Sequence, residues 1–178
     1  MKPNKPEISF RPVVQQDYRR LKSWMELPHW REWWGEPETE LGLIREMVEG
    51  RDSTRPYLFL IDGVETGYIQ YWIVKDHQNA EWVAKHPWLA ELPANSIGID
   101  LSIGDEKNLS KGLGSAVLKA FTKMLATKGY QTMIIDPDVN NLRAIRAYEK
   151  AGFSFVPSLE AIASDVHIMQ LELNEKSI

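Results

Sequence analysis

Apolar and polar residues follow one another along this chain in two rhythms, one typical of strands and one typical of helices. Short apolar runs, several of them alternating with polar residues, predict strands at residues 8–13, 57–61, 64–74, 97–104, 132–135, 153–156 and 166–173. Apolar residues that recur every three or four positions predict helices at residues 15–25, 39–49, 115–128 and 141–151. Strands and helices in this succession indicate an α/β fold.

Turn-forming residues mark the ends of several of these segments. Asp62-Gly63 separates two apolar runs and is typical of a tight hairpin turn. Gly152 directly follows the last predicted helix, where a left-handed residue commonly ends a helix. Residues 75–95 show no clear periodicity and contain two prolines, so we expect a long loop there. Loops of that length in a compact domain are usually functional or disordered.

The predicted strand at 97–104 carries an acidic residue in its middle. Its isoleucines and leucine point to one side, and the residues on the other side are Gly98, Asp100, Ser102 and Gly104. Strands disfavour aspartate and a buried charge is costly, so Asp100 calls for an explanation. Its small neighbours predict room for a ligand beside the carboxylate. The alternative is an aspartate at the sheet edge that pairs with a lysine.

Composition and charge exclude several classes of protein. We expect the 178 residues to form one domain spanning 1–178, and the net charge of −4 argues against nucleic acid as a partner. The chain has no cysteine and its four histidines show no ligand spacing, so no metal site is expected. No secretory signal and no apolar run of membrane-spanning length is present, which predicts a cytoplasmic protein without membrane contact.

A glycine-rich turn, Lys111-Gly112-Leu113-Gly114, lies between a predicted strand and a predicted helix that starts near Ser115. Backbone N–H groups converge at such a turn and can hold a phosphate group, especially where glycine lets the ligand approach closely. The positive end of the helix and the Lys111 ammonium add to the attraction. Taken alone, the same four residues also fit a plain turn before a helix.

In the predicted helix at 141–151, Asn141, Ala144 and Tyr148 are spaced so that all three lie on one face. An isolated aromatic residue at such a position is more often a core residue than a functional one. The accompanying small and amide side chains favour a face that contacts a ligand.

These motifs together resemble the GCN5-related N-acetyltransferases, and in particular the aminoglycoside 6′-N-acetyltransferases. The resemblance rests on the glycine-rich turn, on the segment that starts at Asn141, and on three further matches: Tyr148-Glu149-Lys150-Ala151-Gly152-Phe153, Gly98-Ile99-Asp100 and Glu32-Trp33-Trp34-Gly35. It implies one N-acetyltransferase domain, built on a mixed, mostly antiparallel central sheet with helices on both faces. It also implies transfer of an acetyl group from acetyl-CoA to the 6′-amino group of an aminoglycoside.

The resemblance also implies roles for individual residues. Acetyl-CoA would be held by Leu101, Ile103, Lys111, Gly112, Leu113, Gly114, Ser115, Asn141 and Ala144. Asp100 would be the base or the anchor of the amine, and Tyr148 would give a proton to the departing thiolate. With no cysteine and no serine in a nucleophile-elbow context, we expect direct transfer in a ternary complex.

The expected substrate is a small polycationic amine. Asp136 ends a predicted strand, and if that strand neighbours the one with Asp100, two carboxylates open onto one cleft. An aspartate that caps the turn before Asn140 fits the same position equally well. Trp88 and Glu91, in the predicted loop, complete the expected substrate site, with Trp82 as a second indole that could form a lid.

Three alternatives stay open at this stage. One is a hydroxylysine-type siderophore acyltransferase, which uses the same chemistry on another amine. Another is a CoA-binding regulatory module without turnover, against which the presence of both Asp100 and Tyr148 argues. The third, an acetyltransferase that acts on nucleic-acid-associated proteins, is disfavoured by the charge balance. The sequence is compatible with a monomer or a homodimer.

Overall fold

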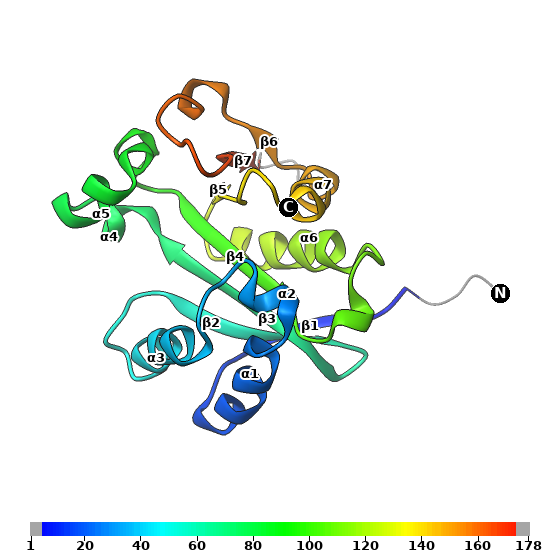
Figure 1. The fold of residues 1–178 in the computed structure, drawn as a ribbon. Helices are drawn as coiled ribbons and strands as arrows, with labels where there is room; N and C mark the ends of the chain where they lie inside the picture. The colour runs from blue at the N-terminus through cyan, green and yellow to red at the C-terminus, as the bar shows by residue number, and fades with distance from the viewer. Residues whose placement is uncertain (1–4, 174–178) are drawn as a thin grey trace. The chain divides into compact units, whose positions relative to one another are not determined.

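A computed structural model describes residues 5–173 of the chain (Figure 1). Its helices and strands, with 3₁₀ helices labelled η, occur in this order: β1 (Ile8–Pro12), η1 (Gln15–Asp17), α1 (Tyr18–Met25), α2 (Pro28–Arg31), α3 (Pro37–Val48), β2 (Arg55–Ile61), β3 (Val64–Ile73), α4 (Val74–His77), α5 (Ala80–Lys85), η2 (Pro87–Glu91), β4 (Ile97–Ile103), η3 (Glu106–Asn108), α6 (Leu113–Ala126), β5 (Thr132–Ile135), α7 (Leu142–Ala151), β6 (Ser154–Phe155), η4 (Pro157–Leu159) and β7 (Met169–Glu172). Within residues 5–173, no helix has the length and apolar character that crossing a bilayer requires.

The strands hydrogen-bond in the order β1-β2-β3-β4-β5-β7-β6. The pairs β1–β2, β5–β7 and β6–β7 are antiparallel, whereas β4 and β5 are parallel. Parallel neighbours need a long connection, and α6 lies in the segment between these two strands. An α/β fold with a mixed, mostly antiparallel sheet is therefore confirmed.

The chain folds as two compact units. The first unit holds the residues up to Gln70 together with Leu101–Leu113, and the second holds Tyr71–Asp100 together with the residues from Gly114 onward. Strands β3 and β4 each contribute residues to both units. The packing inside each unit is described separately below.

The core of the first unit consists of apolar faces of α1, α2 and α3 packed with strand residues. Its buried members are Val13, Leu21, Met25, Trp30, Leu41, Ile44, Leu58 and Tyr68. Helix α2 is only four residues long, so the sequence pattern did not predict it. The Trp30 indole N–H donates a hydrogen bond of 2.9 Å to the Ile103 carbonyl oxygen and so ties α2 to the end of β4.

The core of the second unit includes residues from the segment that we expected to be a loop. Residues 74–91 instead form α4, α5 and η2, which lie beyond the end of β3 in Figure 1. These helices are four to six residues long, too short for a helical period to be visible in the sequence. The buried members of this core are Val74, Trp88, Leu89, Leu92, Ile134, Leu159, Ala163 and Ile168.

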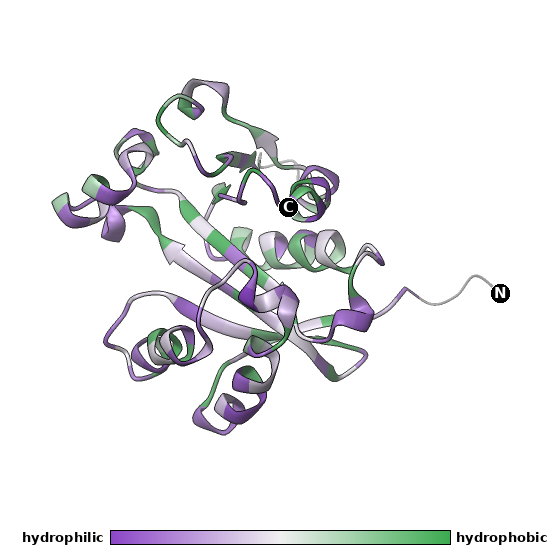
Figure 2. Cartoon of the chain, in the orientation of Figure 1, coloured by the Kyte–Doolittle hydropathy of each residue, from purple (hydrophilic) through white to green (hydrophobic). Residues whose placement is uncertain are grey.

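Several local predictions from the sequence are confirmed. Asp62 and Gly63 both have positive φ angles, 49° and 79°, as a tight hairpin turn between β2 and β3 requires. Gly152 ends α7 with a φ of 104°, and its N–H donates to the Glu149 and Tyr148 carbonyl oxygens. The alternation of β4 is visible in Figure 2 as hydrophobic segments separated by more polar ones.

Two glycines of the first unit are needed because another group occupies the space where a side chain would lie. A Cβ on Gly67 would lie 2.2 Å from Phe59 Cζ and 2.5 Å from the Ser102 carbonyl oxygen. A Cβ on Gly104 would lie 2.3 Å from Cε2 of Trp24. The expectation that Gly104 leaves room for a ligand is therefore wrong, because the Trp24 indole fills that room.

The packing around Gly67 gives a first testable prediction. We expect Gly67→Ala to lower the free energy of unfolding by about 3 kcal/mol, because a backbone carbonyl oxygen has little freedom to move away. Gly42→Ala is the matched control in the same unit: Gly42 lies inside α3, and a Cβ there meets nothing within 4 Å. That control should raise the stability by about 0.5–1 kcal/mol. Urea unfolding of both variants measures the difference, and equal midpoints would contradict the assignment.

Candidate active site

Two carboxylates lie side by side at the carboxyl end of the parallel strand pair. In the β4–β5 ladder Ile97 pairs with Met133 and Gly98 with Ile134. The same offset, continued by two residues, sets Asp100 beside Asp136, which directly follows β5. Side chains two residues apart on a strand point to the same face, so both carboxylates extend from one face. The sequence predicted this adjacency only if the two strands were neighbours, and the strand order confirms that β4 and β5 are neighbours.

A phenol joins the carboxylate pair from α7. Tyr148 is 9% exposed, and burial, followed by the charges of Asp100 and Asp136, raises the pKa of its hydroxyl. Arg143 on the same helix acts in the opposite direction. Burial also raises the pKa of Asp136 well above its ordinary value, and the Asp100 charge raises it further. The three groups therefore form one electrostatic cluster in which Tyr148 keeps its proton at neutral pH.

Trp72 of β3 contacts this cluster directly. Its Nε1–H donates a hydrogen bond of 3.1 Å to Asp100 Oδ2, and its indole covers Gly98, where a Cβ would lie 1.9 Å from Cε2. The space above Gly98, which we expected a ligand to use, is therefore filled by the indole. Sequence reasoning placed Trp72 in a strand without assigning it a role. The contact could have been predicted from a glycine on one strand that lies opposite an aromatic residue on the neighbouring strand.

The glycine-rich turn leads into α6 as expected, but its two glycines differ in backbone conformation and in surroundings. Gly112 has a φ of 74°, a left-handed conformation that favours glycine, and a Cβ there would meet nothing within 4 Å. Gly114 lies in the first turn of α6, and a Cβ on it would lie 3.7 Å from the Ala147 Cβ of α7. Because α6 starts at Leu113 and not near Ser115, the N–H groups of its first turn begin within the turn itself.

Asn141 caps α7. Its side-chain oxygen accepts a hydrogen bond of 3.2 Å from the Ala144 N–H, so that oxygen has a structural task at the start of the helix. Ala144 is half-buried and Tyr148 is buried, in keeping with the shared face predicted from their spacing. The cofactor roles of Asn141 and Ala144 stay predictions.

The remaining predicted residues belong to the first unit or to the helices that follow β3. Leu101 and Ile103 are half-buried strand residues of the first unit, and Lys111 is exposed. Trp88 is only 5% exposed and packs in the core of the second unit, whereas Trp82 is 41% exposed. Of the two indoles, only Trp82 is available for a lid.

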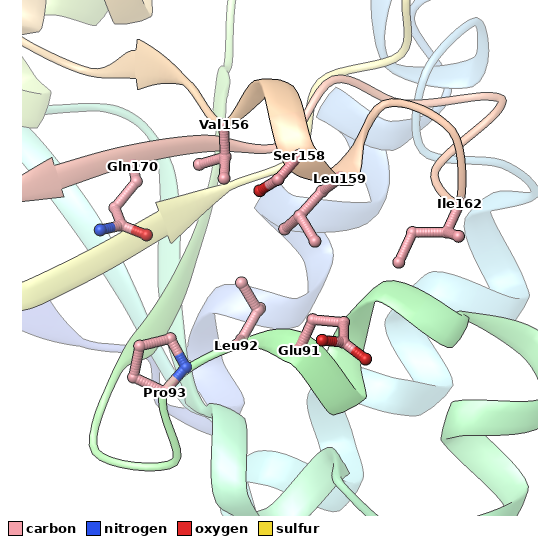
Figure 3. Close-up of a pocket in the computed structure, with 8 residues that line it drawn as sticks. All are labelled: Glu91, Leu92, Pro93, Val156, Ser158, Leu159, Ile162 and Gln170. Atoms are coloured by element: carbon pink, nitrogen blue, oxygen red, sulfur yellow. The ribbon is translucent and has the colours of Figure 1, made fainter.

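Glu91 lines a pocket of the second unit that contains neither carboxylate of the pair (Figure 3). Its side chain lies across this pocket from the side chains of η4 and the segment that follows it. The lining residues are Glu91, Leu92, Pro93, Val156, Ser158, Leu159, Ile162 and Gln170. This pocket therefore does not bring Glu91 together with Asp100 and Asp136.

Comparison with known proteins decides the family. A family model for the acetyltransferase (GNAT) domain matches residues 13–161. Aminoglycoside N(6′)-acetyltransferase type 1 of Klebsiella pneumoniae is 32% identical over 153 residues, which cover 82% of this chain and 73% of that protein. The chain belongs to the GNAT acetyltransferases.

Solved structures of this family have the same fold. AAC(6′)-Ib in complex with paromomycin and acetyl-CoA superposes with a TM-score of 0.78 at 26% identity, covering 96% of this chain and 95% of that one. The same enzyme in complex with coenzyme A and kanamycin gives a TM-score of 0.77 at 27% identity, with 96% of both chains covered. Membership of the GNAT family confirms the prediction of an acyltransferase that uses acetyl-CoA.

The residues before α6 fit the phosphate part of acetyl-CoA. A turn with left-handed Gly112 leads into a helix of 14 residues, so the N–H groups of its first turn point out of the helix end. Gly114 lies opposite Ala147 of α7 at this end, and a Cβ on it would be in ordinary van der Waals contact with the Ala147 Cβ at 3.7 Å.

The electrostatics of the carboxylate pair give a second prediction, on stability. Folding raises the pKa of Asp136 above its ordinary value of 3.8. At a pH below 3.8 the carboxyl group is protonated in the folded and the unfolded protein and does not affect stability. At a pH above the raised pKa its ionisation opposes folding fully. Asp136→Asn removes that opposition and should stabilise the ligand-free protein more at pH 8 than at pH 5. Urea unfolding at the two pH values tests this, with Glu160→Gln, an exposed carboxylate, as the control. A gain of the same size at both pH values would contradict the assignment.

The start of α6 gives a third prediction, on cofactor binding. Proline is tolerated at the first position of a helix but has no N–H, so Leu113→Pro removes one donor and keeps the helix. We expect the dissociation constant of acetyl-CoA to rise about tenfold, the effect of one hydrogen bond to a charged group. Leu113→Ala keeps the N–H and is the control. Isothermal titration calorimetry measures both, and equal affinities would place the phosphates elsewhere.

Proposed function

We propose that this GNAT acetyltransferase transfers the acetyl group of acetyl-CoA directly to the 6′-amino group of an aminoglycoside. The observation that carries the proposal is the pairing of Asp100 and Asp136 on neighbouring parallel strands, with the Tyr148 phenol beside them. Relatives named as aminoglycoside N(6′)-acetyltransferases, and solved complexes of AAC(6′)-Ib with aminoglycosides, support the choice of substrate.

In the proposed reaction, Asp100 first takes a proton from the bound ammonium group and passes it to solvent. The neutral amine nitrogen then attacks the thioester carbonyl carbon, a C–N bond forms, and the C–S bond breaks as the tetrahedral intermediate collapses. The thiolate takes the phenolic proton of Tyr148. The nitrogen then loses its second proton, and this proton restores the Tyr148 hydroxyl. The products are the amide, coenzyme A and one proton released to solvent, so atoms and charges balance.

Tyr148 suits the role of the acid because its hydroxyl is protonated when the thiolate departs. The buried phenol beside two carboxylates has a raised pKa, so ionisation at neutral pH is unfavourable. The chain contains no cysteine, and an acetyl-thioester intermediate on the enzyme is therefore ruled out.

The carboxylate pair favours a substrate with more than one positive charge. A lone ammonium group balances one carboxylate, whereas two adjacent carboxylates repel each other until a second cation is near. A polycation therefore binds best in the state in which both Asp100 and Asp136 are ionised. The attraction weakens as salt increases, since part of it is screened near 0.15 M ionic strength.

A fourth prediction tests the function itself. Purified protein with kanamycin and acetyl-CoA should release coenzyme A and yield a product whose NMR spectrum shows an amide at the 6′ position. Asp100→Asn should lower kcat/KM by roughly 100-fold, the usual loss with a general base, while acetyl-CoA still binds. Glu160→Gln is the control for a carboxylate outside the pair.

Three outcomes would contradict the proposal. Acetylation of another amino group would show that the 6′ position is wrong, while the aminoglycoside substrate class would still hold. Absence of turnover with every aminoglycoside, together with turnover of a hydroxylysine-type amine, would show a siderophore acyltransferase. Binding of acetyl-CoA without turnover of any amine would indicate a regulatory module.

A further inference from the structure

The Asp100 carboxylate meets an indole on the face of the sheet from which it extends. Trp72 lies on β3, 28 residues before Asp100, and donates its Nε1–H to Oδ2 at 3.1 Å. This bond involves one carboxylate oxygen and lies within the second unit. A donor fixed in this way holds the plane of the carboxylate and favours its ionised form.

Gly98 makes this arrangement possible. It lies two residues before Asp100 on the same face of β4, and the Trp72 ring lies directly against its backbone. A Cβ at this position would lie 1.9, 2.1 and 2.5 Å from Cε2, Cζ2 and Nε1 of the indole, so any other residue would displace the atom that carries the donor. The glycine and the tryptophan therefore act together in placing the N–H.

The indole is also held on its outer side. His77 of α4 packs against it edge to face, with ring centroids 4.9 Å apart, and its Nδ1 lies 3.0 Å from the Ile73 carbonyl oxygen. Trp82 of α5 continues the row at 5.0 Å from His77. Short helices α4 and α5 thus restrict the orientation that Trp72 can take.

We propose that Trp72 is a positioning residue for the acetyl transfer, which aims the Asp100 carboxylate at the incoming amine through the bond from its indole N–H. The inference rests on the proposed function of Asp100 as base. Because Oδ2 is tied to the indole, the bond fixes the plane in which both oxygens of the carboxylate lie. Trp72 itself does not take part in proton transfer, since an indole N–H only donates.

Trp72→Phe tests the inference, because it keeps an aromatic ring and removes the donor. We expect kcat/KM for kanamycin to fall about tenfold, the loss that one hydrogen bond to a charged group brings. The fall should lie in kcat, while the KM for acetyl-CoA stays within about twofold. Trp24→Phe is the matched control: Trp24 covers Gly104 as Trp72 covers Gly98, so the same atoms are lost from an indole on a glycine.

A second measurement does not depend on turnover. Carboxyl ¹³C NMR follows the titration of Asp100 in an Asp136→Asn background, which removes the coupling between the two carboxylates. Loss of the donor should raise the pKa of Asp100 in Trp72→Phe and leave it unchanged in Trp24→Phe. Tyr148 of α7, whose pKa responds to the Asp100 charge, and His77 of α4, which packs against Trp72, are retained in both variants.

Gly98→Ala serves as an independent variant, since it displaces the indole without removing any polar group from the chain. It should raise the pKa of Asp100 in the same direction, and in the Trp72→Phe background it should add little to that shift. An unchanged pKa and an unchanged kcat in Trp72→Phe would overturn the inference. If the parent protein acetylates no aminoglycoside, the proposed function fails, and the ¹³C titration still decides whether Trp72 orients Asp100.

Discussion

The parallel pairing of β4 with β5 is the constraint on which the site depends. In a parallel ladder the offset between strands stays constant, so the pairing of Gly98 with Ile134 fixes Asp100 next to Asp136 without further adjustment. Neighbouring strands lie about 4.8 Å apart, a distance at which two carboxylates affect each other's ionisation strongly. The raised pKa values of Asp136 and Tyr148 follow from this placement and from burial.

The second constraint is the close approach of aromatic rings to glycines in β3, in β4 and directly after β4. Phe59 lies against Gly67 and Trp24 against Gly104 in the first unit, and Trp72 lies against Gly98 in the second. Each ring takes the space of a missing side chain. Small residues around an acidic group can therefore indicate a packed indole as readily as an open ligand site. At Gly98 the packed ring also brings a hydrogen-bond donor to Asp100.

Much of the fold could be predicted from the sequence because its signals are local. The Asp62-Gly63 turn, the alternation of β4 and the glycine that ends α7 each act over a few residues, and the structure has all three. Helices α2, α4 and α5 were missed because four to six residues are too few to show a helical period. Their stability comes from tertiary packing, as the burial of Trp30 in the first unit illustrates.

The candidate site shows the same division between local and distant information. Spacing along one helix predicted the shared face of Ala144 and Tyr148, and the turn before α6 was visible in four residues. The bond between Trp72 and Asp100 was not visible, because it joins different strands across 28 positions. The sequence placed Asp136 at the end of a strand, but its position beside Asp100 depended on the order of the strands, which no local pattern contains.

The carboxylate pair opposes folding, and this is a reason to regard it as functional. Burial and the Asp100 charge raise the pKa of Asp136, so ionisation of Asp136 destabilises the ligand-free state, and an amide or an apolar residue at position 136 would remove that cost. A polycationic substrate relieves it in another way, because its ammonium groups balance both charges when it binds. The free energy lost in the empty protein is then recovered as affinity for a cation, and the recovery is greatest for a substrate with several amino groups. Burial, followed by the charges of the same two carboxylates, raises the pKa of the Tyr148 hydroxyl. Under the proposed function, one placement of two carboxylates thus serves both the selection of the substrate and the protonation state of the acid, at a cost in the stability of the empty site.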